Sequence, residues 1–185
     1  MTICKEGRQN GFDSRTHSGR LDRALQVAWR NVLGFFHSAS RRFSLGVSMD
    51  LWDFVQAYIK TKVDWDKKWG PQCVDLPRQY WHDVWGFPKF EGVDGAKDLV
   101  LKYNQMPTEK EYLCLVSDPK SGRQGDVVVF GATEKNEFGH VAIVLDITMN
   151  YLVVFEQDGF KKDGAKIGKW RYNNVIGYLR PWSEV

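Results

Sequence analysis

Residues 140–158, HVAIVLDITMNYLVVFEQD, decide how the second half of this chain folds. Two runs of β-branched and aliphatic residues flank a short polar segment, a pattern that is typical of a β-hairpin. With the loop centred on Thr148, an antiparallel ladder places His140 directly opposite Glu156. The residues that share this face, and would form a core beside the pair, are Ala142, Val144, Leu152 and Val154.

The expected contact between His140 and Glu156 has two interpretations. A carboxylate can accept a hydrogen bond from one ring nitrogen, which fixes the tautomer and favours the protonated state that a general base reaches during reaction. The same two residues could also form a polar pair at the end of a sheet, without any catalytic role. A third reactive group nearby would favour the catalytic interpretation.

The segments around this hairpin predict an α+β domain, in which helices come first and an antiparallel sheet follows. Residues 125–131 and 175–182 have the β-branched and aromatic composition of strands. Earlier in the chain, Ser48 can cap a helix, and a second, short helix covers VDLPRQYWHDVWG at residues 74–86. The apolar face of the first helix consists of Leu51, Phe54, Val55, Tyr58 and Ile59.

The composition indicates one globular domain preceded by a basic extension. The chain has 185 residues, a formal net charge of +3 and 43% hydrophobic residues, which excludes a disordered or fibrous chain. Residues 1–48 contain eight Arg or Lys against three Asp or Glu, and the first 19 residues are polar and without period. We therefore expect a partly disordered extension at 1–47, with an amphipathic helix from Arg20, and a catalytic domain at 48–185. Met49 could serve as an internal start.

The sequence gives no indication of a membrane anchor or a secretion signal. No apolar run approaches the ~20 residues of a membrane-spanning helix, and Arg30 and Asn31 interrupt the best candidate for a signal peptide. We therefore expect a protein made in the cytoplasm. The basic extension could attract any polyanion, wall polymers included, and nucleic acid is not expected as a partner.

Among the three cysteines, Cys73 has the surroundings of a nucleophile. Pro77 is tolerated only near the start of a helix, because it lacks the N–H and clashes with the carbonyl four residues back. This places Cys73 at a helix N-terminus, where the helix dipole favours a thiolate. Cys4 lies in the polar tail, and Cys114 lies in the apolar run EYLCLV, where a core role is expected. The spacing indicates neither a disulfide framework nor a zinc site.

Five short motifs resemble, in order and spacing, the CHAP domain (cysteine, histidine-dependent amidohydrolase/peptidase) of bacteriophage endolysins. The motifs are GPQCVDLPRQY, GDVVVF, FGHVAIV, FEQD and GYLRPW. The resemblance implies a papain-like α+β fold, with N-terminal helices packed on an antiparallel sheet, and cleavage of amide bonds in peptidoglycan. It implies that Cys73 is the nucleophile, that His140 is the base and later the acid, and that Glu156 orients the imidazole. Asp158 stands where such lysins commonly have Asn, and the Gln72 side chain is a candidate oxyanion donor.

The segment DWDKKWGPQCVDL, residues 64–76, resembles a calcium site that some of these lysins contain. Side-chain oxygens would come from Asp64, Asp66 and Asp75, and backbone carbonyls would come from Lys68 and Gly70. This donor set suits Ca²⁺, which prefers six to eight oxygen ligands in a flexible shell. The pattern is not that of an EF-hand, and the alternative is a solvated acidic loop whose charge neighbouring lysines offset.

We therefore expect a peptidoglycan hydrolase of the phage endolysin type, which stays in the host cytoplasm until lysis and then acts on the cell wall. It would be an endopeptidase or an N-acetylmuramoyl-L-alanine amidase, since both cleave an amide by the same acyl chemistry. Two alternatives remain open. One is a cysteine amidase acting on a soluble peptide or polyamine conjugate, and the other is a non-catalytic wall-binding module of the virion.

Overall fold

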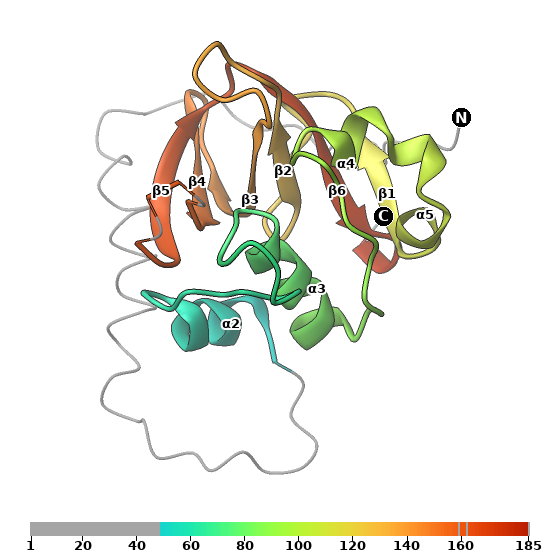
Figure 1. The fold of residues 1–185 in the computed structure, drawn as a ribbon. Coiled ribbons are helices and arrows are strands. Elements are labelled where there is room, and N and C mark those ends of the chain that lie inside the picture. Colours follow the sequence, from blue (N-terminus) through green and yellow to red (C-terminus); the bar gives the residue numbers. More distant parts are fainter. Residues whose placement is uncertain (1–48, 159, 162, 185) are drawn as a thin grey trace.

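A computed structural model of the chain describes residues 49–158, 160–161 and 163–184. It contains an antiparallel sheet of six strands in the order β1-β6-β2-β3-β4-β5, with helices against one face (Figure 1). The predicted extension at 1–47, including its helix, lies outside the described residues. The strands are β1 (Leu113–Val116), β2 (Val127–Phe130), β3 (His140–Ile147), β4 (Tyr151–Glu156), β5 (Lys166–Arg171) and β6 (Val175–Pro181). The helices are α2 (Leu51–Tyr58), α3 (Asp75–Trp85), α4 (Asp98–Leu101), α5 (Pro107–Tyr112), and the 3₁₀ turns η1 (Tyr103–Gln105) and η2 (Trp182–Glu184).

Helix α2 is capped by Asp50, so the prediction of Ser48 as its cap was wrong. The Asp50 carboxylate accepts hydrogen bonds from the Trp52 and Asp53 N–H groups at 2.8 Å, and the Asp53 side chain accepts one from the Asp50 N–H. This reciprocal capping box satisfies amides that the first turn of a helix leaves without partners. The predicted apolar face is confirmed, because Phe54 and Val55 are fully buried.

Helix α3 begins at Asp75, two residues after Cys73. The prediction that Cys73 lies at the helix N-terminus is therefore corrected to the turn just before it, in which the Asp75 N–H donates to the Gln72 carbonyl at 3.2 Å. Pro77 is the third helical residue, where its missing N–H costs no helical hydrogen bond. At the other end, Gly86 adopts a left-handed conformation (φ +66°) and terminates the helix.

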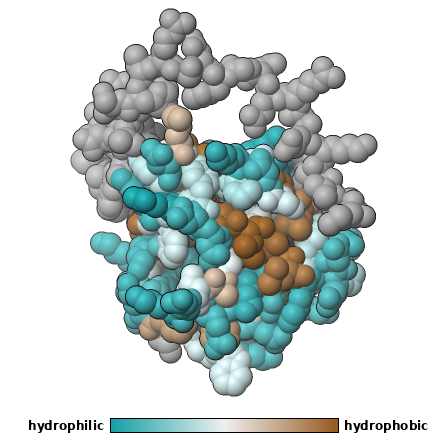
Figure 2. Space-filling model, turned by 90° about the horizontal axis from the view of Figure 1, so that it is seen from above, coloured by the Kyte–Doolittle hydropathy of each residue, from teal (hydrophilic) through white to brown (hydrophobic). Residues whose placement is uncertain are grey.

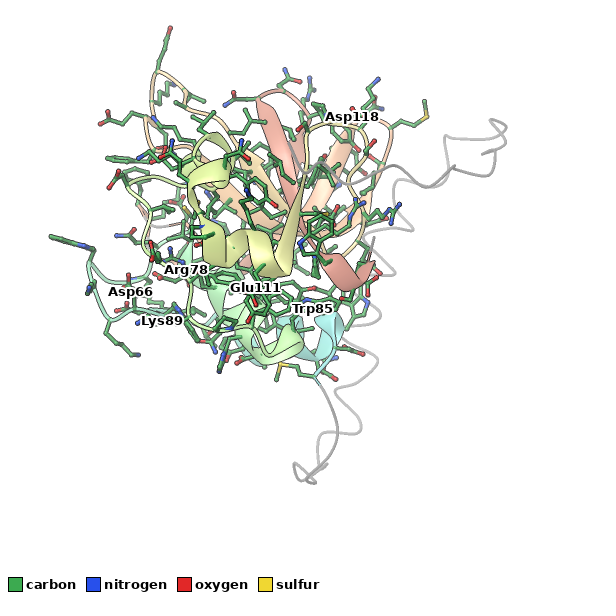
Figure 3. The ribbon with its side chains drawn as sticks, turned by 90° about the vertical axis from the view of Figure 1, so that its right-hand side faces the viewer. Asp66, Arg78, Trp85, Lys89, Glu111 and Asp118 are labelled. Carbon is green, nitrogen blue, oxygen red and sulfur yellow. The ribbon has the colours of Figure 1, made fainter. Side chains whose placement is uncertain are left out.

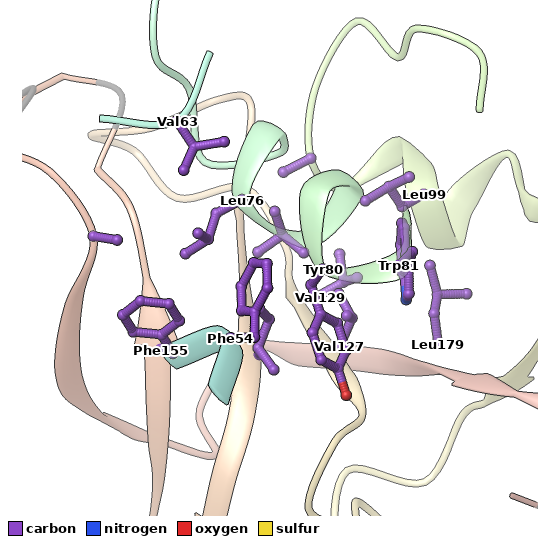
Figure 4. Packing of buried hydrophobic residues seen from close by; sticks show 14 of the residues in the cluster. Phe54, Val63, Leu76, Tyr80, Trp81, Leu99, Val127, Val129, Phe155 and Leu179 are labelled. Carbon is purple, nitrogen blue, oxygen red and sulfur yellow. The ribbon is translucent and has the colours of Figure 1, made fainter. Parts of the chain in front are cut away.

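Two groups of buried side chains alternate along the strands and therefore lie on opposite faces of the sheet. One face packs against the helices, and Figure 4 shows this core between α2, α3 and the sheet. Its centre is aromatic: the ring of Phe54 lies 5.3 Å from that of Tyr80 and 6.2 Å from that of Phe155. On the other face, the four residues predicted to accompany His140 and Glu156 lie in one buried cluster, as expected: Ala142, Val144, Leu152 and Val154.

The hairpin of β3 and β4 forms as predicted, but its register differs by two residues. Ile143 pairs with Phe155, and a bulge between Val144 and Asp146 displaces the ladder by one further residue. The reason is the turn, which is centred after Thr148: the Thr148 N–H and hydroxyl both donate to the Tyr151 carbonyl, at 3.0 and 2.7 Å. A shift of two residues keeps each side chain on its face. His140 and Glu156 therefore still meet at the end of the hairpin, diagonally across the two strands instead of directly opposite each other.

The sequence pattern missed the two edge strands and the short helices between residues 98 and 112. Strand β5 reads KIGKWR, and its side chains are half-buried or exposed, so it has no apolar alternation that could identify it.

Figure 2 shows the face at the top of Figure 1, where hydrophilic side chains surround one apolar area. Within the described part of the chain, no helix is long and apolar enough to cross a membrane.

Candidate active site

The structure brings Cys73, His140 and Glu156 together from three elements: the turn before α3, the start of β3 and the end of β4. His140 Nε2 donates to Glu156 Oε2 at 2.7 Å, and a side-chain hydrogen bond joins the imidazole to Cys73. Since Nε2 is occupied by the carboxylate, Nδ1 is the ring nitrogen that faces the thiol. Cys73 is a free, partly exposed thiol, whereas the side chains of His140 and Glu156 are only 12% and 8% exposed.

The surroundings of His140 favour its charged form. Burial by itself lowers the pKa of the imidazole, but the hydrogen bonds with Cys73 and Glu156 outweigh this effect and raise the pKa from 6.5 to about 9. The ring is therefore protonated at neutral pH and can act as a general acid. Because the folded-state pKa is raised, the stability that this group contributes is fully present below pH 6.5 and is lost as the pH rises through about 9.

Two aromatic residues enclose the imidazole, and sequence reasoning assigned neither of them to the site. The Trp170 ring, on β5, stacks on His140 with centroids 4.9 Å apart and planes 24° apart. Its Nε1–H donates to Glu156 Oε2 at 2.9 Å. Phe130, on β2, lies 6.2 Å from the imidazole and 4.9 Å from the indole. A tryptophan in an unrecognised edge strand gave no signal in the sequence.

Gly168 makes room for the Glu156 carboxylate. A Cβ atom at this position would lie 2.3 Å from Glu156 Oε1, well inside van der Waals contact. The carboxylate therefore lies over the backbone of the neighbouring strand, where any side chain would displace it. This requirement is steric and becomes visible only when β5 is placed beside β4.

Gln157, which follows Glu156, holds the segment that carries the cysteine. Its side chain is fully buried. Its Oε1 accepts from the Val63 N–H at 2.7 Å, and its Nε2 donates to the Val63 and Gln72 carbonyls at 2.7 and 2.9 Å. The amide thus connects the end of β4 with both ends of the acidic segment. The sequence motif FEQD contains this residue, but the resemblance implies roles only for its acidic neighbours.

The predicted oxyanion donor Gln72 lies in the turn next to Cys73. Its backbone N–H donates to Asp75 Oδ2 at 2.8 Å and its carbonyl accepts from the Asp75 N–H, so the two residues close the turn reciprocally. Asp75 is buried, which raises the pKa of its carboxyl to about 6; the hydrogen bond from Gln72 opposes this effect. The role of the Gln72 side chain in oxyanion binding stays a prediction.

Asp158, the candidate site residue that stands where similar lysins commonly have Asn, has backbone partners in the structure. Its Oδ1 accepts from the backbone N–H groups of Phe160 and Lys161, at 2.9 and 3.3 Å. The carboxylate thereby shapes the chain that leaves β4, while Glu156 holds the His140 ring. A direct role of Asp158 in catalysis stays a prediction.

The predicted calcium ligands lie in an irregular segment before α3. Lys67, Trp69 and Gly70 adopt left-handed backbone conformations, and the Lys68 N–H donates to Asp66 Oδ1 at 2.8 Å. Left-handed non-glycine residues are uncommon and concentrate at ligand sites and other constrained loops. The predicted ligand Gly70, with φ +74°, takes this conformation without steric cost.

The fit of these residues to a cation is partial. Asp64 Oδ1 is buried without a hydrogen-bond partner, and the charges of Asp64 and Asp66 both raise the pKa of Asp75. Such a group of hard oxygens suits Ca²⁺, and the Arg78 guanidinium offsets part of its negative charge. Among the described residues, however, no three acidic, histidine or cysteine side chains converge as a bound metal requires. The buried guanidinium of Arg78 lies on the same side of the molecule as Asp66 (Figure 3).

The comparison with known families decides to which one this arrangement belongs. Residues 62–158, more than half of the chain, match the model of the CHAP domain. The chain belongs to the CHAP domain family. The matched residues include the cysteine, the histidine and the glutamate of the site, and they end at Asp158.

Two of the proteins to which this chain is similar are named as endolysins. Endolysin PlyTW of Staphylococcus phage Twort is 28% identical over 146 residues, which are 68% of this chain but 29% of PlyTW. The crystal structure of the wild-type endolysin LysIME-EF1 superposes with a TM-score of 0.51 at 18% identity, over 69% of this chain and 61% of that one. Ly7917 gives a TM-score of 0.49 at 19% identity, over 69% of this chain and 60% of Ly7917. The chain thus spans less than two thirds of each relative, and the likeness to LysIME-EF1 confirms the α+β fold.

Proposed function

We propose that this CHAP domain is a peptidoglycan hydrolase of the phage endolysin type, which cleaves an amide bond in the peptide part of the bacterial cell wall. The observation that carries the proposal is the contact of one imidazole with both a free thiol and a buried carboxylate. A nucleophile beside a base that a third group orients is the general arrangement for acyl transfer. The similarity to endolysin PlyTW favours the cell wall as the substrate.

In the proposed mechanism, the Cys73 sulfur attacks the carbonyl carbon of the scissile amide and becomes covalently bound to it. His140 Nδ1 gives its proton to the leaving amine, and the C–N bond breaks. A water molecule then loses a proton to Nδ1 and attacks the thioester, which releases the acid and restores the thiol. Glu156 holds the ring through Nε2 during both steps, since its hydrogen bond favours the protonated imidazole.

The tetrahedral oxyanion requires hydrogen-bond donors next to the sulfur. We propose the Cys73 backbone N–H and the Gln72 side chain for this role, because both belong to the turn that the Gln72–Asp75 hydrogen bonds close. We also propose that Asp64, Asp66 and Asp75, with the carbonyls of Lys68 and Gly70, hold a structural Ca²⁺. The ion would neutralise these carboxylates and brace the segment before Cys73, and it would take no part in bond cleavage.

The test uses purified cell walls and mass spectrometry of the released fragments. Cys73→Ala and His140→Ala should each abolish release, while His82→Ala, which removes the exposed histidine of α3, should leave it unchanged. New amino termini within the stem or cross-bridge peptide would identify an endopeptidase, and peptides that begin with the L-alanine freed from muramic acid would identify an amidase. Release by Cys73→Ala would contradict the mechanism.

The same experiment addresses the two alternatives. Cleavage of small peptide or polyamine conjugates, with none of walls, would favour the soluble amidase. Wall binding that is unchanged in Cys73→Ala, with no bond cleaved by the wild type, would favour the non-catalytic module. The assembled triad favours acyl transfer over a purely binding role.

A further inference from the structure

We propose that Trp170 is a positioning residue, which locks the Glu156 carboxylate and the His140 ring in the geometry required for amide cleavage. The inference rests on the proposed function, since it assigns a part in that reaction to a residue outside the triad. Two independent contacts of the indole carry the inference. One is a hydrogen bond to Glu156, and the other is a ring stack on His140.

The polar contact fixes the carboxylate. Glu156 Oε2 accepts from His140 Nε2 at 2.7 Å and from Trp170 Nε1 at 2.9 Å. A carboxylate that is held by a single donor can rotate about its terminal bond, because that torsion is broad. With two donors on the same oxygen, and with Gly168 leaving space for Oε1, only one orientation satisfies all contacts.

The aromatic contact fixes the ring. The planes of Trp170 and His140 are 24° apart at a centroid distance of 4.9 Å, so rotation of the imidazole would drive it into the indole. A protonated imidazole over an indole face also gains a cation–π attraction. The Phe130 ring, on β2, lies 4.9 Å from the indole and thereby limits the movement of Trp170.

The electrostatic surroundings leave few other groups that could hold the imidazole. From β4 it faces Glu156, and from the turn before α3 it faces Cys73. From β2 it meets the uncharged Phe130. On β5, Lys166 is the ladder partner of Glu156, and its ammonium group binds Asp163 at 2.9 Å. Trp170 is therefore the residue of β5 that reaches the reacting pair, and it is 37% exposed.

The test separates the two contacts with two substitutions in the full chain. Trp170→Phe keeps an aromatic ring and loses the N–H, and Trp170→Leu loses both. We expect kcat on purified walls to fall about tenfold in the first and further in the second, since hydrogen bonds to charged groups have about this strength. Trp182→Phe is the matched control, because it removes an indole N–H that donates to the Lys110 carbonyl instead. It should retain wild-type kcat.

A second readout does not depend on wall cleavage. NMR titration of the His140 imidazole should give a lower pKa in Trp170→Leu than in the wild type, because a misplaced ring loses its hydrogen bonds with Glu156 and Cys73. In a Glu156→Gln background, Trp170→Phe should change kcat much less than it does alone, since the carboxylate through which it acts is gone.

The outcomes distinguish the inference from the function on which it rests. If Trp170→Leu folds and retains both the kcat and the His140 titration of the wild type, while Glu156→Gln alters both, the positioning role is refuted and the hydrolase stands. If the wild type releases no wall fragments but Trp170→Leu still lowers the pKa of His140, the positioning role stands and the proposed substrate is wrong. Additive effects of Trp170→Phe and Glu156→Gln would also refute the inference.

Discussion

The thiol and the imidazole of this site are held by different kinds of structure. Cys73 lies in a turn that two side chains hold through the backbone of Gln72: Gln157 donates to its carbonyl, and Asp75 accepts from its N–H. His140 lies on a central strand, between aromatic rings and above a buried apolar cluster. Hydrogen bonds of a few residues can be lost singly, whereas packing is spread over many contacts. The nucleophile should therefore be easier to misplace than the base.

The largest effect should come from the buried amide that holds the cysteine segment. Gln157→Leu leaves the N–H and carbonyl of Val63 without partners, and we expect the free energy of unfolding to fall by about 3 kcal/mol and wall cleavage to fall with it. Urea unfolding and wall assays would measure both. Gln79→Leu, which removes a hydrogen bond to Asp83 on the surface of α3, should change neither by more than a small amount. Equal stability of the two variants would show that the Gln157 amide does not hold the cysteine segment in place.

The second largest effect should come from Gly168→Ala, on the imidazole side, which should lower kcat with little change in stability. Gly168→Ala introduces a Cβ atom 2.3 Å from Glu156 Oε1, so the carboxylate must move away from His140. We expect kcat to fall about tenfold, as for the loss of one charge-assisted hydrogen bond, with little change in melting temperature. Gly92→Ala is the control, because a Cβ atom there meets nothing within 4 Å. Unchanged activity of Gly168→Ala would show that the carboxylate has room to adapt.

A change in the pH profile should accompany the loss of the glutamate charge. Because Glu156 helps to raise the pKa of His140 to about 9, Glu156→Gln should lower that pKa towards 6.5 and move the alkaline limb of kcat/KM to lower pH. Activity near pH 8 should then fall more than activity near pH 6. Glu137→Gln, in the exposed loop before β3, serves as the control and should leave the limb in place. An unmoved limb in Glu156→Gln would mean that another group titrates there.

The smallest effect should be that of the proposed calcium ion, which acts on the cysteine side alone. Excess EDTA should lower the melting temperature by a few degrees, and Ca²⁺ should restore it better than Mg²⁺, because a site of several protein oxygens suits the larger ion. Asp64→Asn should lose this response and keep the His140 titration. No change in melting temperature with EDTA or Ca²⁺ would refute the site.

Much of the fold could be predicted because its strongest signals are periodic. The apolar runs of β2, β3, β4 and β6 and the stripe of α2 identified these elements, and the face shared by His140 and Glu156 survived an error of two residues in register. The error in register arises from the turn closed by Thr148 and Tyr151 and from the bulge between Val144 and Asp146, and the alternation of residue types reveals neither.

Two further residues of the site, Gln157 and Trp170, could not be predicted from the sequence for a physical reason. Gln157 and Trp170 act through contacts with residues that are distant in the sequence, since Val63 lies 94 residues from Gln157 and Glu156 lies 14 residues from Trp170. Polar residues of this kind have no periodicity. Strand β5 is an edge strand with mostly polar side chains, so neither its existence nor the neighbours of Glu156 could be read from the pattern.

The close approach at Gly168 also has a consequence for protein engineering. A side chain at position 168 must displace the glutamate carboxylate at position 156, whereas a shorter acceptor such as aspartate would leave that space empty. A combinatorial library that varies one of these positions alone should return only the wild-type residue. A library that varies both together should contain functional pairs that neither single scan can reach.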